Sequence, residues 1–336
     1  MPQFTGDKFG FGSPNATGDS GPAPFAATGG TKITSGDYTY HVFSTDHPSP
    51  EKTFTATSGT RSAEVLVVAG GGGSAWDNGG GGGGGGVAHV PAITLSPGSI
   101  AVVIGGTSDY ATGRSGNFPW KGNDSTFAHP FGTITAKGGG CPGAQNATGP
   151  YEINNASEDG GSGAGGRRTN PGANNAYKAN ASSGIQPTQN PSYPVTVNNY
   201  GNNGGSAESG GATWWFGGGG GGAGAAGESF SGGHDGGNGQ PFSNFPGPVI
   251  SPGVPSPEKS AFETAVTPTG LFGGGGGGSS ESPATTGEGG TGGGGDGSNP
   301  SAAVIDGIYG TGGGGGSGGG EGGAGGSGIV CIRYLT

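Results

Sequence analysis

The hydrophobic residues of this chain fall in short segments that alternate with polar residues, a pattern typical of β-strands. Residues 38–43 are aromatic and β-branched, residues 54–57 alternate, and the segment 64–69 contains, after Glu64, a continuous apolar run of the length of a buried strand. Residues 93–104 hold two apolar segments around a Ser-Pro-Gly-Ser sequence, which predicts a hairpin. Because no segment shows the period of an amphipathic helix, these segments predict an antiparallel sheet.

Two later segments complete the predicted sheet. Residues 131–137 alternate between apolar and polar side chains, and residues 329–334 read Ile-Val-Cys-Ile-Arg-Tyr, a strong strand signal. We expect the second of them to return and pair with the early strands. The sequence therefore predicts a small antiparallel β-sandwich over residues 31–137, which also holds the first glycine tracts and is closed by a strand at 328–336.

Between residues 138 and 327 the strand pattern gives way to glycine. Glycine makes up 90 of the 336 residues, and much of it is unbroken. An isolated polyglycine segment does not fold, because glycine loses more backbone entropy than any other residue and has no side chain to bury. An ordered structure therefore needs interactions between tracts, which lie at 79–86, 217–222, 273–278, 292–295 and 312–316.

Large apolar residues adjoin the tracts, which flexible Gly/Ser linkers do not show. A Trp-Trp-Phe sequence at 214–216, a Leu-Phe pair at 271–272 and an Ile-Tyr pair at 308–309 each come shortly before a tract. This approximate internal repeat predicts parallel rods that are held at one end by an apolar layer.

The extended three-fold helix of polyproline gives these rods a geometry. It rises about 3.1 Å per residue and makes no internal hydrogen bonds, so an eight-residue tract spans roughly 25 Å. Every N–H and C=O must then find a partner in an adjacent rod, and only glycine lets backbones approach that closely. We predict an all-β protein with little or no helix, in which residues 138–327 form a packed bundle of polyglycine II helices connected by variable loops. The alternative is a set of glycine-rich loops over an ordinary domain.

Charge and cysteine content exclude several classes of protein. The net charge is −10 and the pI is near 4.8, so we expect no nucleic-acid partner, because no basic stripe is present to neutralise phosphates. No apolar run approaches about 18 residues, so we expect no membrane insertion. The two cysteines, Cys141 and Cys331, do not make a disulfide framework; we expect free thiols, with Cys331 buried in a strand.

Catalytic, cofactor-binding and metal-binding signatures are missing. Residues 315–319 formally match the Gly-x-Ser-x-Gly nucleophile elbow, but they lie in a glycine tract without the flanking strand and helix. Asp296 and the His234-Asp235 pair sit in glycine-rich sequence that loosely resembles calcium-binding repeats, but the required period is absent. We therefore expect a protein that is not an enzyme and that binds no cofactor or metal.

Recognition by aromatic residues is compatible with this composition. Loops rich in Tyr, Trp, Ser, Gly and Asn are typical of antibody paratopes, and aromatic rings also suit the apolar faces of sugars. For each ring the alternative is an anchor that packs against the end of a rod. The candidate receptor-contact residues are Trp76, Tyr110, Trp120, Tyr151, Tyr177, Tyr193 and Tyr200.

Residues 1–30 are rich in Gly, Pro, Ala and Thr and show no strand or helix period. Four phenylalanines are spaced along this segment. We expect an N-terminal docking arm that uses them to contact either a partner or the body of the chain itself; they are Phe4, Phe9, Phe11 and Phe25.

Five of these motifs occur together in a known group of proteins. They are the strand at 38–43, the apolar run at 65–69 that leads into glycine, the Leu-Ser-Pro-Gly turn at 95–98, the strand at 131–136 and the terminal strand at 328–334. Together they resemble the glycine-rich domain of bacteriophage tail-fibre and other virion structural proteins, over residues 31–336. More distantly, the rods are similar to those of T-even-type phage adhesins, in which a polyglycine II lattice displays variable loops.

This resemblance implies a virion structural protein, most simply a tail-fibre or fibre-tip component that displays loops for host attachment. The alternative that it leaves open is a structural virion subunit without receptor binding, such as a capsid decoration or tail-assembly protein. Expected partners are other virion proteins, a host surface protein or glycan, and further copies of the chain in a homo-oligomer. The expected location is the virion.

Overall fold

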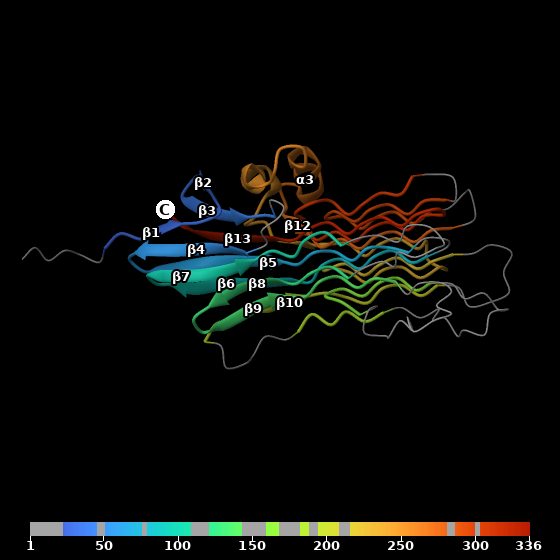
Figure 1. Ribbon diagram of the computed structural model, residues 1–336, viewed down its shortest axis with the longest axis horizontal. Helices are drawn as coiled ribbons and strands as arrows, with labels where there is room; N and C mark the ends of the chain where they lie inside the picture. The colour runs from blue at the N-terminus through green and yellow to red at the C-terminus, as the bar shows by residue number, and fades with distance from the viewer. Residues whose placement is uncertain are drawn as a thin grey trace, which may run out of the picture.

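The protein is elongated, with β-sheets at one end and parallel extended rods at the other (Figure 1). In this computed structural model, none of the helices in the described part of the chain is long and apolar enough to cross a membrane. The residues described are 23–45, 51–75, 79–108, 121–142, 159–167, 182–187, 194–207, 216–280, 286–299 and 303–336.

The first sheet has five antiparallel strands in the order β1-β4-β7-β8-β9. Its first strand lies in the segment predicted to be an N-terminal arm, so that prediction is wrong for residues 26–28, which pair with β4. The strands are β1 (Ala26–Thr28), β4 (Glu51–Ser58), β7 (Gly98–Val103), β8 (Ser125–His129) and β9 (Gly132–Ala136).

The second sheet has six antiparallel strands in the order β10-β6-β5-β13-β3-β2. Its C-terminal strand lies in the middle, between β5 and β3, which confirms that this strand returns to the early sheet. The strands are β10 (Asn198–Tyr200), β6 (Val87–Leu95), β5 (Arg61–Val68), β13 (Ile329–Leu335), β3 (Tyr38–Phe43) and β2 (Thr31–Ser35).

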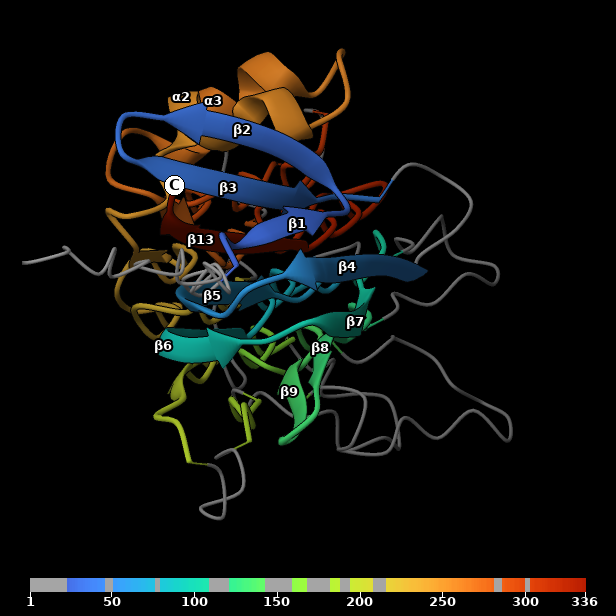
Figure 2. The ribbon, with the colours of Figure 1, turned by 90° about the vertical axis from the view of Figure 1, so that its left-hand side faces the viewer.

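The two sheets pack face to face (Figure 2) around one hydrophobic core. Phe54 and Phe127 from the first sheet meet Val65, Val67 and Ile332 from the second, and all five side chains are fully buried. Because side chains alternate along each strand, one face of each sheet supplies this core. The fold is therefore the predicted antiparallel β-sandwich.

Two short helices cover the outer face of the six-stranded sheet, where the sequence predicted only loops between rods. They are α2 (Gly247–Ile250) and α3 (Lys259–Val266), joined through the 3₁₀ turn η1 (Ser251–Gly253). The short ladder of β11 (Gln240–Pro241) and β12 (Leu271–Phe272) closes this insert. Its apolar residues form a second core with that face of the sheet, which includes Phe245, Ile250, Phe262, Val266 and Phe272.

The strands continue directly into the rods. The chain leaves β5 at Val68 and passes into the rod 69–75, and the rod 79–86 leads into β6 at Val87. The rod 137–142 likewise follows β9. Since successive rods run in opposite directions and start from paired strands, the strand order of the sandwich fixes where these rods lie (Figure 1).

The rod 79–86 lies at the centre of the lattice and pairs with a different neighbour at each successive residue. Gly81 and Gly84 donate to the carbonyls of Gly218 and Gly221, at 3.0 and 2.9 Å. This repeat of three residues is that of a polyglycine II helix. Six other segments surround this rod as donors or acceptors: 69–75, 137–140, 159–165, 216–222, 273–279 and 312–315.

Packing between the rods leaves no room for side chains at the contacts. A Cβ added to Gly82 would lie 2.1 Å from the carbonyl oxygen of Gly72, and one added to Gly276 would lie 2.0 Å from that of Gly315. Hydrogen bonds between backbones thus replace a hydrophobic core in this part of the protein. The predicted lattice is confirmed, and the alternative of loose glycine-rich loops is wrong.

Side-chain oxygens occupy hydrogen-bonding positions at the perimeter of the lattice, where a further rod would otherwise lie. The carboxylates of Asp296 and Asp306 accept the backbone N–H groups of Gly289 and Ala324, each at 2.7 Å. Both aspartates are exposed, so they satisfy donors that face solvent. The same role is filled by Asp124, Asp159, Asn203, Asp235 and Asn238.

Candidate attachment and display ends

The two ends of the molecule differ in what they expose. The sheet end is made of the strand turns, such as those at Asp37, Gly59 and Gly132. The rod end is made of the rod residues farthest from the sheets, such as Ala75 and Gly79. The described rods between these two ends are held to one another by backbone hydrogen bonds.

Phe25 belongs to the sheet end and packs on the chain itself. Its ring meets that of Tyr334 edge-to-face at a centroid distance of 4.9 Å, against the core between the two sheets. We expected the phenylalanines of the arm to contact either a partner or the body of the chain, and Phe25 contacts the body of the chain. Phe4, Phe9 and Phe11 lie outside the described residues.

A buried histidine lies beneath this contact. The Nδ1–H of His41 donates to the carbonyl of Gly29 at 2.7 Å, and its Nε2 accepts from the hydroxyl of Tyr334 at 3.0 Å. Burial lowers the pKa of His41, because the charged imidazolium loses its hydration. Phe25 and Tyr334 thus pack over a buried histidine whose neutral form is favoured by burial.

This arrangement predicts a loss of stability in mild acid. Burial also lowers the pKa of His129 and of His234, so the folded chain takes up protons less readily than the unfolded chain. A histidine with a depressed folded pKa stabilises the native state above its unfolded pKa of about 6.5, and this contribution falls as pH drops below that value. The free energy of unfolding in urea should therefore decrease from pH 7.5 to 5.5, with a smaller decrease in His41→Gln. A flat or rising profile would contradict this prediction.

At the rod end, Phe216 stacks on the ring of His234, with ring centroids 5.1 Å apart. The N–H of Gly217 donates to Ser279, and that of Ser279 to Gly79, which places Phe216 at the start of the rod far from the sheets. Phe272, by contrast, lies in the second core at the sheets. The prediction of one apolar layer at one end is therefore wrong: anchors flank the rods at both ends.

Tyr200 is the one candidate receptor-contact residue within the described part of the chain, and it lies at the sandwich. It pairs with Val87 at the edge of the six-stranded sheet, and its half-buried ring meets Phe242 edge-to-face at 5.4 Å. It therefore packs against the helical insert rather than at the rod end. Outside the described residues lie Trp76, Tyr110, Trp120, Tyr151, Tyr177 and Tyr193.

Some of the segments that hold these aromatic residues are flanked by described residues at the rod end. Ala75 and Gly79 flank the segment of Trp76, and Arg167 precedes the segment of Tyr177. Arg167 follows Gly165 and Gly166, which pair with the distal half of the central lattice. The chain thus enters these connections at the end of the molecule opposite to the sandwich.

The serine of the formal nucleophile motif, Ser317, is a lattice residue. Its Oγ donates to the carbonyl of Ala75 at 2.6 Å and lies 3.0 Å from the hydroxyl of Ser279. The side chain is fully buried among rods, and its hydrogen-bond partners in the described part of the chain include no histidine. The motif is therefore explained by glycine content and not by a catalytic elbow.

The acidic residues of the suspected calcium turns also have structural partners. The carboxylate of Asp235 accepts the N–H of Glu288 at 2.7 Å, as Asp296 does for Gly289. Within the described ranges, no group of three or more His, Cys, Asp or Glu side chains is placed to hold a metal ion. Cys141 and Cys331 are both buried and are not joined by a disulfide, and Cys331 lies in β13, as expected.

A polar network that sequence reasoning missed joins the helical insert to the sheet. Glu64 accepts from Arg333 at 2.9 Å, from His89 at 2.8 Å and from Asn244 at 3.0 Å. The guanidinium of Arg333 also lies 3.5 Å from the ring centroid of Tyr38. Burial opposes ionisation of Glu64, but its hydrogen bonds outweigh that effect and hold its pKa below the usual value. These contacts hold Asn244, and with it the insert, on the sheet.

Comparison with known proteins fits this architecture. No curated protein matches the chain. A family model described as a glycine-rich domain matches residues 47–335, which covers the later strands of the sandwich and the whole lattice. The chain therefore belongs to this glycine-rich domain family.

Proposed function

We propose that this protein is a structural component of a bacteriophage virion, a tail-fibre or fibre-tip protein that displays loops for attachment to the host. The observation that supports this proposal is that the two ends of the molecule carry different parts of the chain. Ala23 lies beside the turn at Gly59, and the N–H of Thr336 donates to the carbonyl of Asp37. Both positions are at the sheet end, and the connections that follow Ala75 and Arg167 leave from the rod end.

The lattice suits display because its stability does not depend on the sequence of the connections. Each rod is held by backbone hydrogen bonds to its neighbours, such as those from Gly81 to Gly218 and from Gly82 to Gly315. A connection begins and ends at fixed lattice positions, so its residues are free to vary while the rods keep their packing. Such an arrangement would let the residues that recognise a receptor change without a change in the rods.

In this proposal the sheet end attaches to the particle and the rod end faces the host. The phenylalanine arm and the turns near the C-terminus would contact other virion proteins, and aromatic and Asn-rich connections would bind a host surface protein or glycan. We further propose a non-enzymatic homo-oligomer that is located on the virion and contacts neither nucleic acid nor membrane. The acidic net charge of −10 agrees with the absence of a nucleic-acid role.

Locating the protein on the particle tests this proposal. An epitope tag inserted at Gly320, an exposed glycine whose added Cβ would meet nothing within 4 Å, would leave the lattice intact. In phage that carry the tagged gene, antibody-gold particles are expected at the tail tip. Label in icosahedral number over the head would overturn the attachment role and favour a capsid decoration protein.

A second experiment tests receptor contact itself. Exchanging residues 168–181 for those of a relative with a different host range should change adsorption and leave particle assembly intact. Particles that fail to assemble would show that this segment is structural. Unchanged adsorption after each connection is exchanged in turn would favour a virion subunit without receptor binding.

A further inference from the structure

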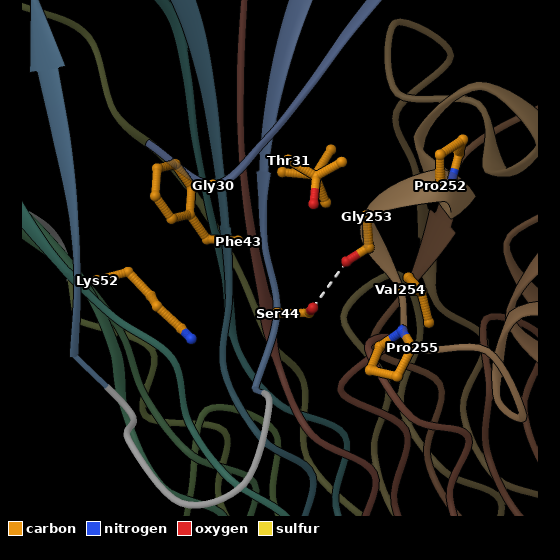
Figure 3. Close-up of a pocket in the computed structure, with 10 residues that line it drawn as sticks. Gly30, Thr31, Phe43, Ser44, Lys52, Pro252, Gly253, Val254 and Pro255 are labelled. Carbon is orange, nitrogen blue, oxygen red and sulfur yellow. Dashed lines mark hydrogen bonds between the residues drawn. The ribbon is translucent and has the colours of Figure 1, made fainter. Parts of the chain in front are cut away.

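A cavity of about 360 Å³ lies on the side of the sandwich, away from both ends of the molecule. It opens where the chain crosses from β1 to β2 through Gly29 and Gly30, and the helical insert forms its other wall. Both sheets and the turn η1 border this cavity, which is open to solvent on one side (Figure 3). Its volume is in the range of sites that bind small molecules.

Lys52 faces this cavity from an unusual position. It lies on β4 two residues before Phe54 and four before Ala56, both of which are buried in the core between the sheets. Because side chains alternate along a strand, Lys52 is on the core-facing side of β4. Charged side chains are rare on such a face unless they are paired.

The ammonium group of Lys52 makes no hydrogen bond or ion pair with any described residue. The hydroxyl of Thr31, which approaches from the other sheet, also has no partner in the described part of the chain (Figure 3). No aspartate or glutamate is among the described residues that line the cavity, although the chain carries ten more negative than positive charges. The cavity is therefore bordered by two donors that have no partner among the described residues, the half-buried Lys52 and the exposed Thr31.

The rest of the lining mixes polar backbone groups with a few apolar side chains. Phe43, Val254 and the rings of Pro252 and Pro255 line the cavity. The hydroxyl of Ser44 donates to the carbonyl of Gly253 at 2.7 Å, which holds η1 against the end of β3. Such a site combines a cation for a charged group with apolar surface for the body of the same ligand.

We propose that this cavity binds a small organic carboxylate with an apolar body. Lys52 and the hydroxyl of Thr31 donate to the carboxylate oxygens, since charge-assisted hydrogen bonds of this kind are the strong ones. Phe43, Val254 and Pro255 pack against the apolar part of the ligand. The size of the cavity fits a ligand of one ring. This inference is independent of the proposed virion function.

Titration calorimetry with benzoate and with benzamide tests this site, because the two probes have the same shape and differ in charge. Benzoate is expected to bind the full-length protein at least about tenfold more tightly than benzamide. Lys52→Met should reduce benzoate affinity about tenfold and leave that for benzamide unchanged. Thr31→Val should reduce the affinity for benzoate by a smaller factor than Lys52→Met does.

Lys32→Met is the matched control. Lys32 lies on the edge strand β2, is exposed and does not line the cavity, so the same change of net charge should leave benzoate binding intact. Equal weakening by Lys32→Met and Lys52→Met would overturn the proposal, as would equal binding of the two probes. If neither probe binds to the folded protein, Lys52 only protects the part of β4 beyond β1 from pairing with other chains.

Discussion

Replacing Gly220 by alanine is expected to destabilise the protein by about 3 kcal/mol or more, because the new methyl group has no space. A Cβ at Gly220 would lie 2.0 Å from the carbonyl oxygen of Gly82, a backbone atom of the central rod. Gly82 is in turn hydrogen-bonded to Gly315 and Gly276, so it moves only if other rods move with it. At positions with space for a methyl group, replacing glycine by alanine stabilises a protein by up to about 1 kcal/mol, because it lowers the conformational entropy of the unfolded chain. That gain is smaller than the energy lost to the clash at Gly220.

Urea unfolding followed by circular dichroism measures this effect. The matched control is Gly320→Ala, since Gly320 is exposed, its φ lies outside the left-handed region, and its added Cβ would meet nothing within 4 Å. The control should unfold at the same or a slightly higher urea concentration than the native chain. If Gly220→Ala were as stable as the control, the rod 216–222 would not be packed as described.

Replacing Phe272 by alanine should lower the free energy of unfolding by about 3–5 kcal/mol, the range for truncation of a large aromatic side chain in a core. Phe272 is fully buried and joins three parts of the fold, since it follows the insert, precedes a rod and packs on the six-stranded sheet. Its ring lies 6.5 Å from that of Phe242 and 6.3 Å from that of Phe262. Its loss would leave a cavity at the junction of sheet, helices and lattice.

The same unfolding measurement applies, with Phe131→Ala as the control. Phe131 lies in the turn between β8 and β9, and 56% of it is exposed. Its truncation should change stability by less than about 0.5 kcal/mol. If the stability of the Phe272→Ala variant also changed by less than about 0.5 kcal/mol, the lattice would not depend on the second core.

Strands with an alternating or a continuous apolar pattern were predictable from the sequence, and strands with neither pattern were not. β3 and β13 present buried residues in a clear pattern, and both were expected where they occur. β2, with the sequence Thr-Lys-Ile-Thr-Ser, is mostly exposed, and only its pairing with β3 makes it a strand. The helix α3 was missed because it is short and buries only Phe262 and Val266, too few positions to set a period.

The existence of the lattice was predictable, but the placement of its rods was not. Glycine tracts carry no side-chain pattern, so no feature of the tract at 79–86 indicates that its neighbours include 216–222. Their order follows from the strands and the insert to which they are joined. The network at Glu64 was hidden for a similar reason, since its partners Asn244 and Arg333 are 180 and 269 residues away in the chain.

The aspartates at the perimeter bear on how copies of this protein behave when crowded together. An uncapped glycine rod offers N–H groups to any similar rod, and glycine-rich segments from separate molecules would then join as stacked fibres do. Asp296 and Asp306 already occupy such donors, and their negative charge repels the same surface of a neighbouring molecule. Copies held at high local concentration would therefore not fuse through the backbones of these perimeter rods.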